Sequence, residues 1–156
     1  MGSDVYSLDA SSVISGWFDY PCNVFPGLWE RIEGLVDEGR LLIAEDVYNE
    51  LKPKDDELVE WLKKIKHAVV PLDKKQQEIV EEIINSYPNF VNALTGKNSG
   101  DPFVIALAKT RNAIVITQEK PAGKLAGPKI PDVCKAEGIT PKRFLDILKM
   151  EGWSFR

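Results

Sequence analysis

The chain has 156 residues, a formal net charge of -4 and an ordinary balance of apolar and charged side chains. This length suits a single domain over residues 1–156 that buries its own core without disulfides or a structural metal. The acidic balance argues against a passive nucleic-acid binder, which carries a basic surface, but allows an enzyme that gathers cations with carboxylates.

The scarcity of histidine and cysteine excludes several kinds of site. His67 is the only histidine, so the chain has no Ser-His-Asp triad, no pair of catalytic histidines and no histidine–cysteine zinc site. Cys22 and Cys134 lie far apart and form no CxxC pattern, so we expect both to be reduced and partly buried in a cytoplasmic protein. No apolar run approaches the length that spans a membrane.

The first half of the chain alternates short apolar runs with segments of helical periodicity. Residues 5–8 predict a buried strand, and Ser11 or Ser12 is expected to cap the helix that follows. Residues 26–38 predict a second helix, and the uniformly apolar residues 41–44 predict a second buried strand. Further predicted elements are short helices over 47–51 and from Asp55, a brief strand over 68–71 and an amphipathic helix over 74–87.

The second half continues the alternation. Residues 89–99 become a polar, glycine-containing loop, after which Asp101 is expected to cap a strongly apolar helix with Pro102 in its first turn. Residues 113–117 predict the clearest strand in the chain, and Glu119 lies just beyond its carboxyl end. Next come a mobile loop over 120–129, rich in glycine, proline and lysine, and helices over 132–137 and 141–150.

Strands that alternate with helices are typical of a parallel sheet with helices on both faces. We therefore predict an α/β fold, organised as a single three-layer α/β/α domain with a central parallel sheet. Trp17, Trp29 and Trp61 occur at helical spacing among aliphatic residues, so they are expected in the core and not as base-stacking platforms. Trp153 and Phe155 are expected to pack back on the body.

Four carboxylates occur in corresponding places along this pattern. Asp9 and Glu119 follow strands, Glu50 lies on the helix after a strand, and Asp101 starts a helix, so all four can meet at the carboxyl edge of one sheet. Carboxylates that are brought together repel one another, and their pKa values rise unless a cation joins them. Oxygen ligands without histidine or thiolate favour Mg2+ or Mn2+ over zinc.

Each of these acids also has a purely structural interpretation. Asp9 and Asp101 can serve as helix caps, Glu50 as a solvated helix residue, and Glu119 as an ordinary loop acid beside Lys120. By spacing alone, metal binding and these structural roles remain open alternatives.

Four motifs in order resemble a PIN domain, most closely the PIN-like group called domain of unknown function 4411 (DUF4411). They are Asp9-Ala10-Ser11 after a strand, the Val-Tyr-Asn-Glu-Leu run of 47–51, the Asp-Pro-Phe-Val-Ile-Ala-Leu-Ala run of 101–108 and the Ile-Val-Ile-Thr-Gln-Glu run of 114–119. The similarity covers nearly the whole chain and includes residues 129–134 near the end.

This resemblance implies a metal-dependent endoribonuclease, often the toxin of a toxin–antitoxin pair, with an antitoxin protein as partner and homodimers in related toxins. Asp9, Glu50 and Asp101 match the family's three main metal-site acids, and Glu119 stands where many PIN domains have an aspartate. Ser11 and Thr117 match supporting hydroxyl positions, and Asp132 falls near the cluster, either as a second-ion residue acting through water or as a helix cap.

The mechanism implied by the resemblance is binding of Mg2+ or Mn2+ by Asp9, Glu50, Asp101 and Glu119, which activates a water. Attack on the phosphorus then leaves 5'-phosphate and 3'-hydroxyl ends. Lys120 and Lys124, in the loop beyond Glu119 that also carries Lys129, are the candidates for contacts to RNA phosphates. Charge reversal at Lys120 and Lys124 is expected to weaken RNA binding and flatten its salt dependence.

Other functions fit the sequence less well. A haloacid-dehalogenase-type phosphatase requires an aspartate where Ser11 stands, and a phosphoacceptor domain requires an acid pair that Asp4 is misplaced to complete. The stronger alternative is a non-catalytic PIN-like module that binds RNA or another protein.

Overall fold

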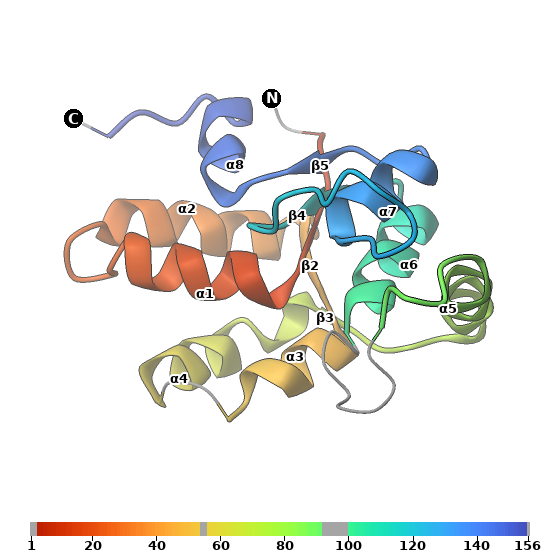
Figure 1. Ribbon diagram of the computed structural model, residues 1–156. Coiled ribbons are helices and arrows are strands. Elements are labelled where there is room, and N and C mark those ends of the chain that lie inside the picture. The colour runs from red at the N-terminus through yellow and green to blue at the C-terminus, as the bar shows by residue number, and fades with distance from the viewer. Residues whose placement is uncertain (1–2, 54–55, 92–99, 156) are drawn as a thin grey trace.

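The computed structural model describes residues 3–53, 56–91 and 100–155, which form a parallel sheet between two layers of helices (Figure 1). Tyr6 lies opposite Leu41 on one neighbouring strand and opposite Ile114 on the other, and residues 6–8 are buried. The expected α/β class with a central parallel sheet is therefore confirmed. The strand order is β3-β2-β1-β4-β5, with β1 at Tyr6–Leu8, β2 at Leu41–Ala44, β3 at Val69–Val70, β4 at Ile114–Ile116 and β5 at Pro141–Lys142.

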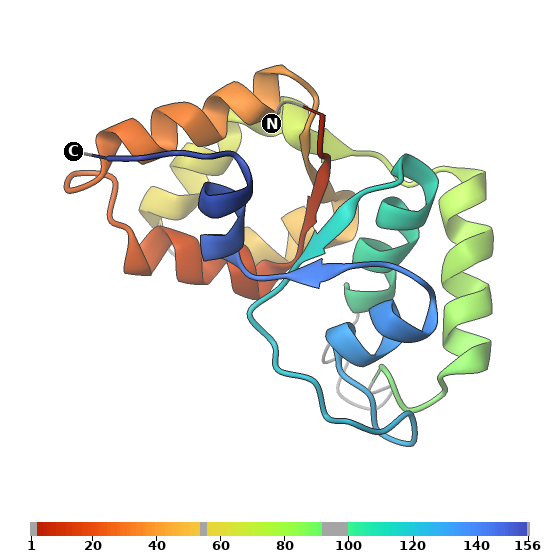
Figure 2. The same cartoon turned by 90° about the horizontal axis from the view of Figure 1, so that it is seen from above.

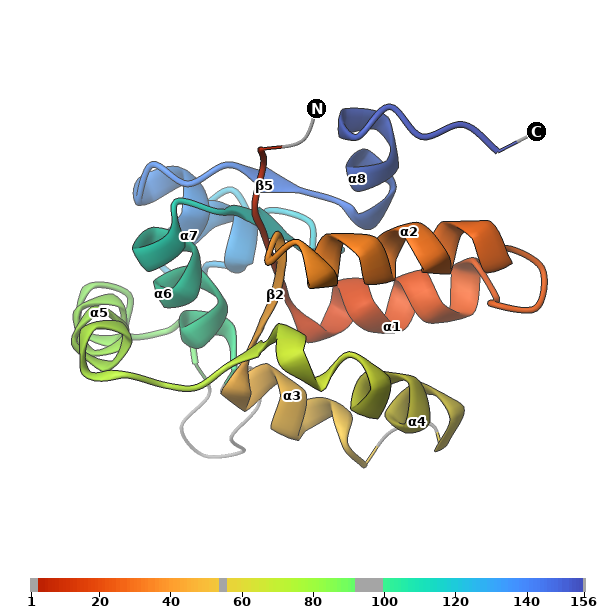
Figure 3. The ribbon, with the colours of Figure 1, turned by 180° about the vertical axis from the view of Figure 1, so that it is seen from behind.

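Helices cover both faces of the sheet. Helices α1, α2 and α8 lie on one side, and α5, α6 and α7 lie on the other (Figure 2). Helices α3 and α4 lie below α1 and α2 when the molecule is seen from behind (Figure 3). The helix bounds are α1 Ala10–Asp19, α2 Pro26–Asp37, α3 Glu45–Leu51, α4 Asp56–Lys64, α5 Lys74–Ser86, α6 Asp101–Arg111, α7 Ile130–Ala136 and α8 Phe144–Met150, with a 3-10 turn at Lys66–Ala68.

Two helix starts differ from the sequence prediction. Asp9, and not Ser11 or Ser12, caps α1, because its side chain accepts a hydrogen bond from the backbone N–H of Ser12. At α6 the N-cap is Gly100, whose backbone is already in the helical region, so Asp101 is the first helical residue and not the cap. Asp101 is thereby left without the helix-capping role that the sequence suggested.

The C-terminal third also differs from the prediction. The helix expected over 141–150 begins only at Phe144, because Pro141 and Lys142 pair with β4 as an edge strand, where proline is tolerated. Helix α7 starts at Ile130, earlier than expected, with Pro131 in its first turn. The start of the predicted helix at Asp55 and residues 92–99 of the predicted loop lie outside the described residues.

Three tryptophans pack together between α1, α2 and α4. Trp29 and Trp61 are buried, as predicted, and their ring centroids are 4.9 Å apart. Trp17 is only partly buried, although its ring contacts both of the others at 5.3 and 5.5 Å. Of the two C-terminal aromatics, Trp153 packs against the core, whereas Phe155 is 43% exposed beneath the guanidinium of Arg31.

The two cysteines are free and lie in different environments. Cys134 is buried, but Cys22 is exposed on the turn after α1, so the expectation that both are partly buried is wrong for each. Among the described residues, no helix has the length and apolar character needed to cross a membrane.

A buried ionic network closes the amino end of the sheet. Arg40, just before β2, forms an ion pair with Glu151, which follows α8, and donates from Nε to the backbone carbonyl of Asp4 at 2.8 Å. The hydroxyl of Tyr6 also donates to Glu151. Segments at both ends of the described chain are thus joined to the central strand, at the edge opposite to Asp9.

Candidate functional site

Asp9 sits at the carboxyl end of β1 with a side chain that is 2% exposed and fixed by hydroxyl groups. Ser11 Oγ donates to its carboxylate at 2.8 Å, Thr117 Oγ1 donates to Oδ2 at 2.5 Å, and the backbone N–H of Ser12 donates to Oδ1 at 2.8 Å. Burial raises the pKa of Asp9, and the hydrogen bonds from Thr117, Ser12 and Ser11 oppose this rise. Both hydroxyl residues predicted to support the site therefore contact its central acid.

The hydroxyl groups also link β1 to the segment after β4. The backbone N–H of Gln118 donates to Ser11 Oγ at 3.0 Å, and that of Glu119 donates to Thr117 Oγ1 at 3.1 Å. The Gln118 side chain accepts from the backbone N–H of Phe144 at 2.8 Å, which ties this segment to α8. Gln118 was not singled out in the sequence, because a glutamine after a strand carries no signal of such a contact.

Glu50, on α3, is positioned by the residue that precedes Asp101. The backbone N–H of Gly100 donates to Glu50 Oε1 at 2.7 Å. A Cβ at residue 100 would lie 2.4 Å from the same oxygen, so only glycine fits against this carboxylate without displacing it. This role of Gly100 was missed in the sequence, where a Gly-Asp-Pro run indicates only the start of a helix.

Asp101 has a strongly perturbed carboxyl group at the start of α6. Its pKa is raised to about 8, first by burial and then by the charges of Glu119, Asp9 and Glu50, while Lys129 lowers it. Its Oδ2 is buried and has no hydrogen-bond partner among the described residues. The structure therefore brings all four predicted acids into one electrostatic cluster around Asp101.

Glu119 lies three residues beyond β4 and faces the same cluster. Burial and the charge of Asp9 raise its pKa, against a hydrogen bond with the Ile130 backbone and the charge of Lys129. Its Oε1 is a second buried oxygen for which the described part of the chain offers no hydrogen-bond partner. The buried thiol of Cys134 responds to the same acids: burial, with Asp9 and Glu119, raises its pKa to about 12, so it remains neutral near pH 7.

Asp132 organises the loop that passes beside the cluster. Its carboxylate accepts from the backbone N–H groups of Ala122 at 2.7 Å, Gly123 at 2.9 Å and Lys129 at 2.8 Å. The bond to Lys129 is part of the N-terminal capping of α7. Of the two roles that the sequence allows for Asp132, the structure therefore shows the helix cap. Because both of its oxygens bind backbone groups, Asp132 is poorly placed to hold a second ion through water.

The three loop lysines lie in different surroundings. Lys129 is the one whose charge lowers the pKa of both Asp101 and Glu119. Lys120 lines a groove of about 360 Å³ next to Thr117 and Glu119, which Arg143 also lines. Lys124 lines a separate surface hollow with Lys135. Lys120 is thus nearer to the acid cluster than Lys124, while Lys129 is coupled to it directly.

The donor set fits a hard divalent cation. It offers carboxylate oxygens only, two of which are buried and unpartnered, and no described histidine or ionised thiol competes with them. In this conformation, however, the described residues contain no ready-made metal site, which requires at least three acidic, cysteine or histidine side chains around one ion position. Metal binding would therefore require side-chain rotation by some of the four acids.

A family model for a domain of unknown function, DUF4411, matches residues 6–155, nearly the entire chain. The chain belongs to the DUF4411 family. Among solved structures, this DUF4411 domain is distantly similar to the crystal structure of PAE2754 from Pyrobaculum aerophilum, with 13% identity and a TM-score of 0.40 over 86% of this chain and 90% of that chain. No curated protein matches the sequence.

Proposed function

We propose that this DUF4411 domain is a PIN-type, metal-dependent endoribonuclease that hydrolyses RNA phosphodiester bonds. The observation that carries the proposal is the environment of Asp101, a largely buried carboxyl group with an unpartnered oxygen and three acidic neighbours. Such an arrangement is unfavourable for folding unless a cation offsets the repulsion, and clusters of this kind are typical of functional sites.

Each acid has a distinct part in the proposed site. Asp9 is the pre-organised ligand, because Ser11, Ser12 and Thr117 fix its carboxylate before a cation arrives. Asp101 and Glu119 offer the free oxygens, and Glu50 approaches from α3 on the Gly100 N–H group. These four residues would hold Mg2+ or Mn2+, which supplies positive charge that activates a water and stabilises the phosphate during displacement.

The chain's own residues also handle protons and substrate charge. Asp101 is largely protonated near pH 7, since its pKa is about 8, so it releases a proton from its carboxyl group when a cation is bound. Lys129, beside Asp101 and Glu119, and Lys120, in the adjoining groove, are placed to attract RNA phosphates to an otherwise acidic site.

The biological setting rests on the sequence resemblance to PIN domains. We propose on that basis that the enzyme is the toxin of a toxin–antitoxin pair, that an antitoxin protein is its partner and that it assembles as a homodimer.

Cleavage of a 5'-labelled RNA by purified protein tests the proposed activity. We expect cleavage with Mg2+ or Mn2+ and none in EDTA, and the products should carry 5'-phosphate and 3'-hydroxyl ends. Asp9→Asn should lose cleavage completely, and circular dichroism checks that this variant is folded. Asp37→Asn, at an exposed aspartate that contacts His67 on the surface, serves as the matched control. Cleavage that persists in EDTA or in Asp9→Asn would refute the assignment.

A second candidate is a non-catalytic module that binds RNA. It is favoured by the absence, among the described side chains, of three acids already arranged around one ion position. The same samples separate the two functions, because this module would bind RNA equally well in EDTA and Mn2+ without cutting it.

A further inference from the structure

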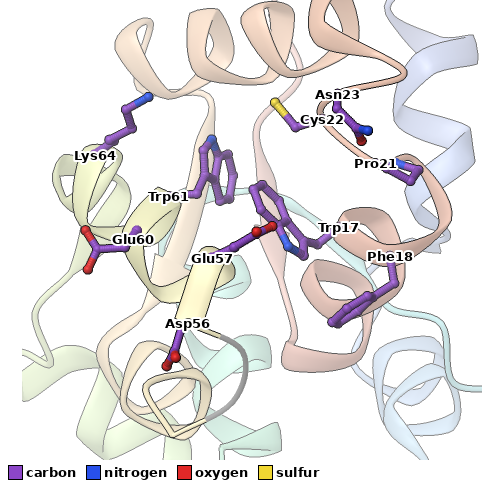
Figure 4. A pocket seen from close by; sticks show the side chains of 10 residues that line it. All are labelled: Trp17, Phe18, Pro21, Cys22, Asn23, Asp56, Glu57, Glu60, Trp61 and Lys64. Carbon is purple, nitrogen blue, oxygen red and sulfur yellow. The ribbon is translucent and has the colours of Figure 1, made fainter.

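A large groove lies on the surface away from the acid cluster, between α1, the turn that follows it and α4 (Figure 4). Its volume is about 960 Å³, the largest of the surface hollows described. Asp9 caps the start of α1, whereas Trp17 and Phe18, which line the groove, lie in the last turns of the same helix. The groove is therefore a separate feature and takes no part in the proposed nuclease chemistry.

The floor and one wall of the groove are aromatic. Trp61, which is 7% exposed, forms the floor with the partly buried ring of Trp17, and the indole N–H of Trp61 already donates to Glu33. Phe18 is 56% exposed at the wall, and Val24, just beyond the lining residues, is 62% exposed. Large apolar side chains left in water beside a hollow are typical of a surface that another protein covers.

The opposite wall, on α4, is acidic. Asp56, Glu57 and Glu60 line it, and Lys64 is the one cation among the described residues that line the groove. Glu60 forms an exposed ion pair at 3.0 Å with Lys63, which lies one turn along the same helix. Exposed pairs of this kind are weak, so an incoming cation can replace Lys63 at small cost.

We propose that this groove, which we call the Trp17–Glu60 groove, binds a basic amphipathic segment of a second protein. The aromatic floor takes an apolar anchor residue, and the acidic wall pairs with arginine or lysine side chains on the same segment. The carboxylates repel an RNA backbone. A small organic polycation would neutralise the acids but leave Phe18 and Val24 exposed, so a protein segment fits the surface better.

Selection of random displayed peptides on the immobilised protein tests this proposal. The peptides have about 15 residues, a length at which an isolated helix is marginally stable. We expect enriched sequences that carry a net positive charge and one or more aromatic or aliphatic anchors. Fluorescence anisotropy with labelled copies of the enriched peptides should then show that Phe18→Glu and Glu60→Lys each weaken binding by about tenfold or more.

Two matched substitutions on the outer face of α5 control for general effects. Ile84→Glu places a carboxylate on a side chain that is 44% exposed, and Glu81→Lys reverses an exposed acid. We expect both to bind the enriched peptides like the parent. All four variants change surface positions, so thermal melting should find them folded, and RNA cleavage should be as in the parent whether or not the nuclease proposal holds.

Several outcomes would overturn the proposal. The selection could enrich no peptide, or it could enrich acidic peptides. Alternatively, Phe18→Glu and Glu60→Lys could bind the enriched peptides with the affinity of the parent. Titration of spermine into the protein separates the small-polycation alternative, since binding of spermine together with failure of the peptides would assign the groove to that ligand. If no peptide binds and sedimentation shows that the protein self-associates, loss of this self-association in Phe18→Glu would assign the groove to a second copy of this chain.

Discussion

At the scale of single residues, the charge state of Asp101 decides how the site behaves without a cation. Its carboxyl pKa is raised from 3.8 to about 8 by burial and by its acidic neighbours. The folded protein therefore binds more protons than the unfolded chain between these two values. Because of this linkage, the free energy of unfolding contributed by Asp101 falls as the pH rises from about 4 to 8.

Asp101→Asn removes this titration and keeps the size of the side chain. In EDTA we expect the variant to melt higher than the parent, with a difference that grows from pH 5 to pH 8 and reaches several degrees. Thermal melts across that pH range provide the measurement. A difference that stays constant with pH, or a variant that is less stable at pH 8, would show that Asp101 is not held protonated in the folded state.

Individual residues also show what a sequence can and cannot predict. A carboxylate directly after a buried strand indicated the position of Asp9 at the carboxyl edge of the sheet, because strand ends follow local patterns. The same pattern favoured Ser11 or Ser12 as the helix cap, a role that belongs to Asp9. Glu119 was selected through the clear strand before it, whereas Thr117 was selected through the resemblance to PIN domains. The contacts of Gly100 and Gln118 join segments that are distant in sequence, so no local pattern contains them.

At the scale of elements, the site depends on how closely α6 approaches α3. Gly100 provides this approach, since its N–H group binds Glu50 and a Cβ at the same position would overlap the carboxylate. The backbone of Gly100 has φ -81°, which any residue adopts, so an effect of substitution reports on contact and not on backbone strain.

Gly100→Ala is expected to displace Glu50 and weaken Mn2+ binding by about 10- to 100-fold, the range seen when groups that orient metal ligands are lost. Gly34→Ala is the matched control, because a Cβ at this α2 position meets no atom within 4 Å and alanine should stabilise the helix by about 0.5–1 kcal/mol. Calorimetric titration of both variants checks this. Equal Mn2+ affinities would remove Glu50 from the site.

Elements also differ in how well they could be predicted. Residues 41–44 are buried throughout and residues 114–116 are buried except for the partly exposed Ile114, and both apolar runs are predicted correctly as strands. The sequence predicts a helix that starts at Pro141, although Pro141–Lys142 form an edge strand. Two residues are too few to show a strand's periodicity, and proline also suits a first helical turn. Its strand character comes from pairing with β4, which is a tertiary effect.

At the scale of the whole molecule, the buried Arg40–Glu151 pair fastens the C-terminal end of the described chain to the sheet. Burial raises the pKa of Glu151, but hydrogen bonds from Arg40 and Tyr6 outweigh it and hold the pKa below its ordinary value. The stability contributed by this carboxylate is therefore present near neutral pH and is lost as the pH falls through its lowered folded pKa.

Glu151→Ala leaves Arg40 buried without its main partner, so we expect a loss of about 3–5 kcal/mol in the free energy of unfolding. Glu38→Ala removes an exposed ion-pair partner of Arg40 and should cost less than about 1 kcal/mol. Urea unfolding at pH 7 measures both. Similar losses in the two variants would mean that the buried pair has no special weight.

Mn2+ calorimetry on the parent and Asp101→Asn, followed by RNA cleavage on the same samples, tests whether the four acids form one cation site in the folded molecule. We expect the parent and the control Asp37→Asn to bind Mn2+ and cut RNA, and Asp101→Asn to lose both while remaining folded. Asp101→Asn that binds and cuts like the parent, or a parent that binds no Mn2+, would contradict the account and leave the acids as helix and loop residues.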